Sequence, residues 1–266
     1  MDIPAVHRAT QQVFKGLSAT LVSIFFAAGC RLCDELVADA RRVPICDHCV
    51  SQFQPILPGY CEKCGLPATF DPEFPKETAY CADCQEHRFG FDLARSYGYY
   101  EGTLSRAVVL LKHEEIEPLG QWFANRLAEL MQAQGERMAA DVIVPVPLHR
   151  QRSRERGYNQ VDLVGRPLAK RWRLPYRPEL LVRAKPRPEK HLLRSEERWE
   201  AVRGAFAMRD GGRVDNLRIL LLDDVMTTGA TLDACSRALR EAGAKSVLGL
   251  TIARAGRPLS SLAEHP

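Results

Sequence analysis

The run that most constrains this chain is a short apolar segment followed by two acids and a threonine-rich loop. Residues 219–222 are four consecutive apolar residues, which predict a strand buried on both faces. Asp223 and Asp224 follow at its carboxyl end, and the loop of residues 227–231 leads into a helical pattern over residues 232–242. A parallel strand that feeds a helix in this way leaves backbone N–H groups free for an anion. The run therefore predicts an α/β domain with an anion-binding loop.

The side chains of this run suit a phosphorylated sugar. Thr227, Thr228 and Thr231 offer hydroxyl donors, and Gly229 would let the backbone close on a phosphate. Two adjacent acids beside a phosphate would repel each other unless they bind ribose hydroxyls or a metal ion held by a sugar phosphate. An ordinary strand–turn–helix with surface acids is the alternative.

The run resembles the phosphoribosyl-pyrophosphate (PRPP) loop of type I phosphoribosyltransferases. In that family a hydrophobic strand, two acids and Thr-Thr-Gly-x-Thr hold the ribose and its 5-phosphate. The resemblance implies that Asp223 and Asp224 lie on the ribose. It also implies that the phosphate is bound by the five loop residues Thr227, Thr228, Gly229, Ala230 and Thr231.

The cysteines predict a second kind of site. Eight of the nine fall in the first third of the chain as four CxxC pairs, separated by 12, 11 and 16 residues. Each pair is a knuckle that turns two thiolates toward one point, and two knuckles make a tetrahedral four-sulfur zinc site. We expect two structural zinc ions, with neighbouring knuckles paired because they close short loops. The ligands would be Cys30, Cys33, Cys46 and Cys49 in one site, and Cys61, Cys64, Cys81 and Cys84 in the other.

Other chemistries for these cysteines are an interleaved cross-brace, disulfides or an iron–sulfur cluster. Disulfides are disfavoured because the rest of the chain is typical of a cytoplasmic enzyme, where thiols stay reduced. Two-knuckle repeats about a dozen residues apart fit zinc ribbons better than iron–sulfur clusters. Gly65, directly after Cys64, suits the tight turn of a zinc knuckle, and the isolated Cys235 is expected to be a buried core thiol.

The N-terminus is apolar but too short to span a bilayer. No run reaches the roughly 18–20 apolar residues that a membrane helix needs. Residues 21–30 read LVSIFFAAGC, which loosely imitates a lipoprotein cleavage site. An acidic Asp2 and the later cysteine pairs disfavour export. We expect an amphipathic helix over residues 1–29 and a cytoplasmic protein without a membrane span.

The pattern after residue 89 predicts alternating strands and helices. Strands are expected at residues 92–100, 141–145, 218–222 and 246–253, and helices at residues 104–113, 119–134, 160–172, 196–202 and 232–242. This alternation predicts an α/β fold with a doubly wound, mainly parallel sheet that binds its ligand at the carboxyl ends of the strands. The expected organisation is a double zinc ribbon at 30–88, a phosphoribosyltransferase-like domain at 89–257 and a tail at 258–266.

Charge is unevenly distributed. The chain has a net charge of +4, yet residues 149–194 contain fourteen Lys or Arg against four acids. A local basic field suits phosphates on a small substrate or on nucleic acid, although a solubilising surface is the plainer alternative. An arginine guanidinium can donate two parallel hydrogen bonds to phosphate oxygens, and a tyrosine ring can stack on a base or sugar. The predicted phosphate or nucleic-acid contacts are Arg150, Arg152, Tyr158, Asn159, Arg187 and Lys190.

Together these motifs resemble the ComF/GntX family, which joins a cysteine-rich zinc ribbon to a type I phosphoribosyltransferase-like domain. Besides the cysteine pairs and the PRPP-like loop, the resemblance rests on Leu111-Lys112, Val-Pro-Val-Pro-Leu at 144–148, Arg-Gly-Tyr-Asn-Gln at 156–160 and Gly-Ala-Phe at 204–206. It implies either transfer chemistry on PRPP with Mg²⁺ or a role in natural competence, and the expected ligand is PRPP or a nucleotide. In competence, ComF proteins help imported single-stranded DNA to be recombined, which implies competence helicase or recombination proteins as partners. Type I phosphoribosyltransferases often dimerise, which implies a homodimer.

The chain also departs from the family pattern. Lys190, Arg194 and Ala201 stand where the family commonly has Gln, Ser and Asn, which weakens the expectation of a conserved reaction without affecting PRPP binding. Our first hypothesis is therefore a PRPP/Mg-binding protein that supports DNA uptake.

The alternative is an active phosphoribosyltransferase in nucleotide-related metabolism without a DNA role. The residues that would offset charge on the departing pyrophosphate are Lys112, Arg154 and Arg156. His113 and His149 are expected to be surface or structural histidines, which leaves no convincing general base.

Overall fold

The structure is a computed structural model that describes residues 29–37, 43–68, 79–86, 89–149, 154, 157–185 and 195–256. Two compact units make up the chain, residues 1–52 and residues 53–266. The expected N-terminal helix at 1–29, apart from residue 29, and the expected tail at 258–266 lie outside the described residues. In the smaller unit, the short helix α2 (Asp47–Ser51) begins directly after Cys46.

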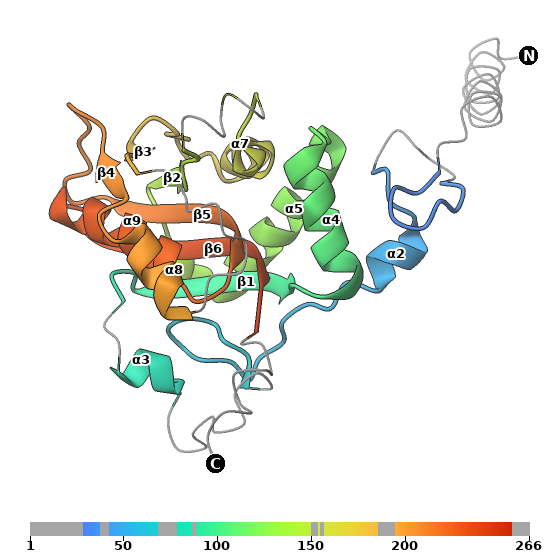
Figure 1. The fold of residues 1–266 in the computed structure, drawn as a ribbon, viewed down its shortest axis with the longest axis horizontal. Helices are drawn as coiled ribbons and strands as arrows, with labels where there is room; N and C mark the ends of the chain where they lie inside the picture. The colour runs from blue at the N-terminus through green and yellow to red at the C-terminus, as the bar shows by residue number, and fades with distance from the viewer. Residues whose placement is uncertain are drawn as a thin grey trace, which may run out of the picture. The chain divides into compact units, whose positions relative to one another are not determined.

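The larger unit is built on a four-stranded sheet in the order β1-β6-β5-β2 (Figure 1). Its strands are β1 (Leu93–Tyr99), β2 (Val142–Pro145), β5 (Arg218–Met226) and β6 (Ser246–Arg254). Every neighbouring pair is parallel, and in the register Leu221 faces Val144 on one side and Gly249 on the other. Because parallel strands need long crossovers, the helical segments between them are required by this topology.

Helices cover both faces of this sheet. They are α4 (Gly102–His113), α5 (Glu117–Gln134), the 3₁₀ turn η2 (Gly135–Met138), α7 (Gln160–Trp172) and α9 (Ala230–Glu241). In β5, Ile219 and Leu221 share one buried cluster with Cys235 of α9. Leu220 and Leu222 are also fully buried and point to the opposite face, on the side of α5 and α7. The expected α/β class with a doubly wound parallel sheet is confirmed, and Cys235 is a buried core thiol.

Two short strands form a second, separate sheet. Strands β3 (Leu181–Arg183) and β4 (Phe206–Met208) pair antiparallel, and helix α8 (Ser195–Val202) precedes β4 and contacts α9. The start of α8 lies one residue before the predicted helix at 196–202. No helix within the described part of the chain has the length and apolar character that crossing a membrane requires.

The strand that carries the two acids is longer than the sequence indicated. We expected it to end at Leu222, but β5 runs on to Met226. The reason is its partner, because β6 continues alongside it and pairs Asp223 with Thr251 and Met226 with Arg254. Ladder hydrogen bonds to a neighbouring strand outweigh the low strand propensity of two aspartates.

The segment that carries the second pair of knuckles runs along the outer edge of β1. Backbone N–H groups of Ile56 and Tyr99 bond to the carbonyls of Tyr97 and Gln54, at 2.9 and 3.0 Å, and the N–H of Ala94 bonds to the carbonyl of Lys63 at 2.7 Å. Helix α3 (Ala82–Glu86) follows in the same unit. The exposed hydrogen-bonding edge of β1 is therefore covered by residues of the zinc-binding region.

Candidate ligand cleft and zinc centres

A cleft of about 400 Å³ opens at the carboxyl ends of β5 and β2. Six of the residues that the sequence singled out line it together: Asp223, Asp224, Thr227, Thr228, Ala230 and Thr231. The remaining walls come from the β2–α7 connection and the start of α7, from α8, from β3, and from Tyr100 and Lys112 at the β1–α4 region. A cleft at this edge of a parallel sheet is the usual position of a ligand in open α/β folds.

The second acid is held by an arranged set of polar contacts. Asp224 is only 7% exposed, and its Oδ2 accepts a 2.7 Å hydrogen bond from the side-chain amide of Gln160. The ammonium of Lys112 lies 3.2 Å from the same oxygen. Asp223 is half-buried, and its Oδ1 accepts a 2.8 Å hydrogen bond from the backbone N–H of Asp224. The two carboxylates therefore have separate partners, which allows adjacent acids to coexist.

The threonine loop links β5 to α9 through a glycine in the left-handed region. Gly229 has φ +84°, and a Cβ there would lie 2.9 Å from the methyl carbon of Met226. The methionine methyl can move aside, so it is the left-handed conformation that favours glycine at this position. Thr228 Oγ1 accepts a 3.3 Å hydrogen bond from the N–H of Ala230, the first residue of α9. The threonines of this loop and the first residues of a twelve-residue helix thus line the cleft, and a helix N-terminus is a favourable environment for an anion.

Helix α7 brings another part of the chain to the acids. Asn159 caps this helix by accepting a 3.2 Å hydrogen bond from the N–H of Val161, and its amide donates to the carbonyl of Val146. The cap fixes where the helix begins, and so places Gln160 at its first position, against Asp224. Tyr158 donates from its hydroxyl to the carbonyl of Leu111, next to Lys112 in α4.

The other predicted residues fall into three groups. Lys112, Asn159 and His149 line the cleft. Arg154 and His113 are exposed. Five predicted positions lie outside the described residues: Arg150, Arg152, Arg156, Arg187 and Lys190.

Sequence reasoning missed three polar residues of this cleft, Gln160, Arg183 and Tyr100. Gln160 closes the Arg-Gly-Tyr-Asn-Gln motif that carried part of the family resemblance, so its position in that motif was the available signal. Arg183 lies at the start of a basic loop and stacks its guanidinium 5.0 Å from the ring centre of Phe206. Tyr100 lies beneath the ammonium of Lys112, 5.9 Å from the ring centre. No sequence pattern set Tyr100 apart from its neighbours.

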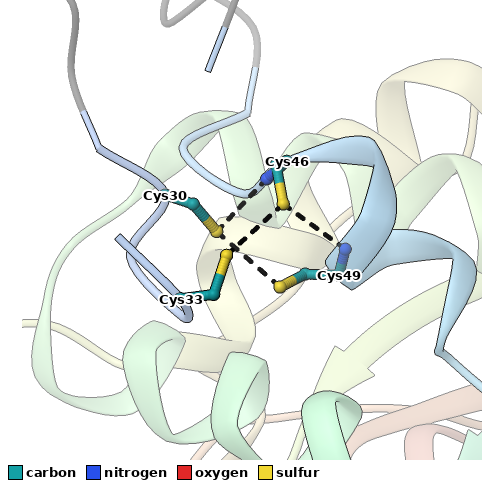
Figure 2. A group of neighbouring side chains, drawn as sticks. All are labelled: Cys30, Cys33, Cys46 and Cys49. Atoms are coloured by element: carbon teal, nitrogen blue, oxygen red, sulfur yellow. Dashed lines mark hydrogen bonds between the residues drawn. The ribbon is translucent and has the colours of Figure 1, made fainter. Parts of the chain in front are cut away.

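The first four cysteines converge as predicted, with their sulfurs turned toward one point (Figure 2). The sulfurs of Cys30 and Cys49 lie 3.9 Å apart, and those of Cys33 and Cys46 lie 3.6 Å apart. Four sulfurs around a zinc ion at about 2.3 Å are separated by about 3.8 Å, so the donor set fits a tetrahedral zinc ion. Backbone N–H groups also point at the sulfurs, with the N–H of Cys46 3.3 Å from the sulfur of Cys30.

The next four cysteines, Cys61, Cys64, Cys81 and Cys84, form an equivalent tetrad in the larger unit. All four sulfurs lie within 4.8 Å of one another, and those of Cys64 and Cys81 are 3.7 Å apart. The pairing of neighbouring knuckles is therefore confirmed, and the interleaved arrangement is excluded for these eight residues. Gly65 has φ +67° and a Cβ there would lie 2.8 Å from the carbonyl oxygen of Ala94, so the turn after this knuckle requires glycine.

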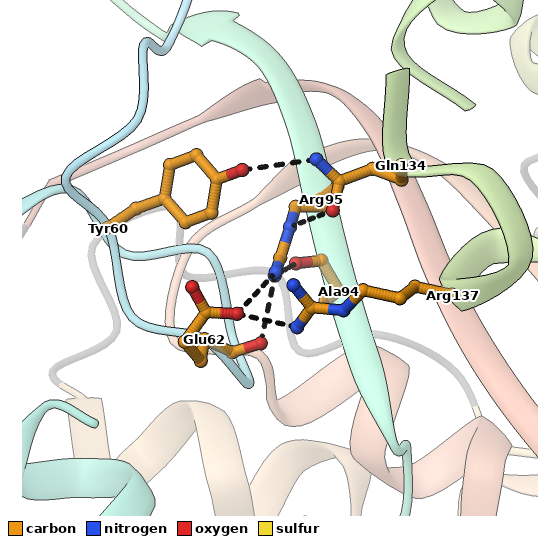
Figure 3. A network of polar contacts seen from close by, with 6 residues as sticks. All are labelled: Tyr60, Glu62, Ala94, Arg95, Gln134 and Arg137. Atoms are coloured by element: carbon orange, nitrogen blue, oxygen red, sulfur yellow. Dashed lines mark hydrogen bonds and ion pairs between the residues drawn. The ribbon is translucent and has the colours of Figure 1, made fainter. Parts of the chain in front are cut away.

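A buried arginine attaches the Cys61/Cys64 knuckle of the second tetrad to the sheet (Figure 3). Arg95 of β1 is 2% exposed and donates to the backbone carbonyls of Ala94 and Glu62, at 2.8 and 3.1 Å. Its guanidinium also stacks on Tyr60 at 4.6 Å and bonds to Gln134 of α5 at 3.1 Å. The zinc-binding segment, the edge strand and α5 are therefore joined through one side chain.

Comparisons with known proteins match the N-terminal part to a family model. The double zinc ribbon domain matches residues 21–85, a range that contains both cysteine tetrads. Two structural zinc centres are thus supported by the family match and by the geometry of the sulfurs.

Curated relatives match most of the chain. Competence protein F of Haemophilus influenzae is 26% identical over 219 residues, which cover 79% of this chain and 90% of that protein. The DNA utilization protein YhgH of Salmonella typhimurium is 29% identical over 206 residues, covering 76% and 87%. Competence protein ComFC of Bacillus subtilis is 27% identical over 221 residues, covering 79% and 84%.

Matches to solved structures are more distant. The glutamine PRPP amidotransferase of B. subtilis is 20% identical, with a TM-score of 0.35, and the match covers 54% of this chain and 30% of that one. The chain thus spans less than a third of that enzyme. An adenine phosphoribosyltransferase of Leishmania tarentolae is 16% identical with a TM-score of 0.34, covering 55% and 74%.

Proposed function

We propose that this chain, which belongs with the ComF competence proteins, binds PRPP with Mg²⁺ in the cleft at the ends of β5 and β2. We further propose that it supports DNA uptake and natural transformation by handling single-stranded DNA. The observation that carries the first part is the convergence of both acids and the threonine loop in one cleft. The eight cysteines are arranged to bind zinc as reduced thiols, which supports a cytoplasmic location for the protein.

Each part of the ligand has a matching part of the cleft. The carboxylates of Asp223 and Asp224 would accept hydrogen bonds from the two ribose hydroxyls. The hydroxyls of Thr227 and Thr228 and the first N–H groups of α9 would bind the 5-phosphate. Mg²⁺ would arrive with the pyrophosphate and offset its charge. Lys112 is the cation already beside Asp224, so it would sit close to the negative charge of the bound ligand.

The test of this part is equilibrium binding of radiolabelled PRPP with and without Mg²⁺. The double change Asp223→Asn and Asp224→Asn removes both carboxylate charges while keeping side-chain volume. We expect it to weaken binding by at least about tenfold, since two charge-assisted hydrogen bonds are lost. Asp141→Asn is the matched control, because Asp141 is bonded to Arg218 at the opposite end of β5.

Three results decide the matter. Binding by the parent and by Asp141→Asn, with loss in the double variant, supports the proposal. Failure of the parent to bind PRPP in the presence of Mg²⁺ overturns it. Release of pyrophosphate during the assay, with a nitrogen acceptor present, would identify the alternative activity of the same cleft, phosphoribosyl transfer.

The DNA part is supported by the names of the relatives and by the charge of residues 149–194. Competence proteins and a DNA utilization protein align with more than three quarters of the chain. The fourteen cations against four acids in that segment are suited to a phosphate backbone. Tyrosines such as Tyr100, at the cleft, provide rings on which unpaired bases stack.

The test is a titration of single-stranded oligonucleotides at several salt concentrations. We expect the affinity to fall steeply as salt rises, because cations on the strand are released when phosphates are neutralised. Changing Arg150, Arg152 and Arg154 to Gln should reduce this salt dependence. Arg213→Gln, which alters an exposed arginine paired with Asp215 outside the basic segment, should not. An affinity that is independent of salt would contradict phosphate contacts by this segment.

A further inference from the structure

Arg254 is a buried cation, and its own strand β6 contains no acidic residue that could offset its charge. It is the last residue of β6, is 3% exposed and pairs in register with Met226 of β5. Its Nη2 lies 3.8 Å from the sulfur of Cys64, a member of the second tetrad. The guanidinium is therefore directed at the zinc centre from the sheet side.

The remaining nitrogens of this guanidinium are unsatisfied. Within the described part of the chain, Nε and Nη1 of Arg254 have no hydrogen-bond partner. The ion pairs formed by the described residues do not include Arg254. A buried guanidinium without an anion costs several kcal/mol in general, so the site calls for a negative charge nearby.

A zinc ion bound by four thiolates supplies that charge. Zn²⁺ with four deprotonated cysteines carries a net charge of −2, and this charge is spread over the sulfurs. We infer that Arg254 is the charge partner of the second zinc centre: its guanidinium neutralises part of the tetrathiolate and so slows the loss of the metal. The role concerns zinc alone and is independent of PRPP or DNA.

The first tetrad offers a contrast within the same chain. There the carboxylate of Glu35 lies 4.0 Å from the sulfur of Cys33 and 3.8 Å from that of Cys46. Three cysteines are buried in each tetrad, and the fourth is exposed in the first tetrad (Cys33) and half-buried in the second (Cys84). A like charge beside the thiolates disfavours them, so the first centre has the opposite electrostatic setting. It belongs to the other compact unit and serves as an internal reference.

The experiment measures zinc release from the full chain loaded with two zinc ions. A chelator in excess removes the metal, and a coloured zinc indicator follows the two phases. Cys33→Ser and Cys84→Ser assign one phase to each centre. Arg254→Met removes the charge and keeps an unbranched side chain, whereas Arg254→Lys keeps the charge. Arg254→Gln is a second neutral variant, which serves if the methionine variant does not fold.

We expect the neutral variants to speed zinc loss from the second centre by about tenfold or more, in line with other outer-shell partners of metal sites. In these variants the rate of zinc release from the first centre should stay within about twofold of the parent rate. In Arg254→Lys the release rates of both centres should stay within about threefold of the parent rates. Cobalt substituted for zinc should show a shift in its sulfur-to-metal absorption only in the neutral variants.

Other outcomes overturn the inference. An unchanged second phase in a folded neutral variant would mean that the guanidinium does not act on the metal. Equal acceleration of both phases would mean a general loss of stability. Lysine behaving like methionine would show that the charge is irrelevant and that only the packing of the arginine matters.

Discussion

The side-chain amide of Gln160 donates a 2.7 Å hydrogen bond to Oδ2 of Asp224, two residues that lie 64 positions apart in the sequence. The same oxygen is approached by Lys112 at 3.2 Å, so one oxygen carries both contacts. Gln160 is itself 5% exposed, and its position at the start of α7 is fixed by the cap on the preceding residue. The carboxylate is therefore held in one orientation before any ligand arrives.

Gln160→Leu tests the value of this orientation. The change removes the amide donor at nearly the same volume, so we expect PRPP affinity to fall about tenfold while the free energy of unfolding falls by about 1–3 kcal/mol. Isothermal titration and chemical denaturation measure the two quantities. Gln121→Leu, on an exposed glutamine that bonds to Asn125, should change neither. An unaltered affinity in Gln160→Leu would show that the hydrogen bond serves packing alone.

Arg95 and Arg137 both form ion pairs with Glu62, and we expect their removal to lower the stability by unequal amounts. Arg95 is 2% exposed and joins three elements, so Arg95→Met should destabilise the larger unit by about 2–3 kcal/mol. Arg137 forms a 2.5 Å ion pair with the same carboxylate, but its side chain is 53% exposed. Arg137→Met should therefore cost less than about 1 kcal/mol. Urea unfolding of both variants provides the comparison, and equal costs would contradict the difference in burial.

The two zinc centres predict unequal effects on the larger unit. Cys61, Cys64 and Cys81 belong to a hydrophobic core cluster that includes residues of the sheet, whereas the first tetrad lies in the other unit. Cys64→Ser removes a zinc ligand inside that core. If it costs about 3 kcal/mol, the unfolding midpoint of the larger unit should fall by roughly 6–12 °C.

Cys33→Ser is the matched control for this change. It breaks the first tetrad and should leave the calorimetric transition of the larger unit in place. A midpoint that falls equally in both serine variants would contradict the division of the chain into two units.

We expect the ion pair of Asp141 with Arg218 to account for part of the loss of folding stability at acid pH. Hydrogen bonds from the Arg218 side chain and backbone N–H hold the pKa of this carboxyl below its usual value. A depressed folded pKa contributes stability above the unfolded pKa of about 3.9, and this contribution is lost as pH falls through the folded value. Both side chains are about a third exposed or more, so solvent screening keeps the contribution below about 1 kcal/mol.

Asp141→Asn should remove this pH-dependent term. The parent should therefore be the more stable of the two at pH 6–7, and the difference should shrink as pH falls below about 4. Denaturant titrations at several pH values measure it. A stability difference that stays constant down to pH 2 would exclude the ion pair as its source.

The zinc tetrads and the strand–loop–helix run were accessible from sequence for a shared physical reason. Both depend on residues close in the chain: a CxxC knuckle closes within four residues, and the loop at 227–231 directly joins β5 to α9. Local geometry and the entropy of closing short loops are sufficient to predict such features.

The contacts that complete the cleft depend on tertiary packing instead. Lys112 and Gln160 reach Asp224 from α4 and α7. The sequence predicted Lys112 as a cation for pyrophosphate and contained Gln160 only as part of a motif, and it predicted neither contact with Asp224. The continuation of β5 past Asp223 is likewise decided by the register of β6. Secondary-structure propensity and hydrophobic periodicity carry no information about which distant strand or helix packs against β5.

The separate character of the two knuckle pairs has a consequence for how such chains can be shortened. Cys61, Cys64 and Cys81 share one core with Phe89 and the sheet, and the backbone around Lys63 caps the edge of β1. A gene that started near codon 53 would still encode a closed hydrophobic core. One that started near codon 89 would leave a bare sheet edge, open to pairing with another molecule. We therefore expect removal of the first ribbon to leave the edge of β1 covered, whereas removal of the second would expose it.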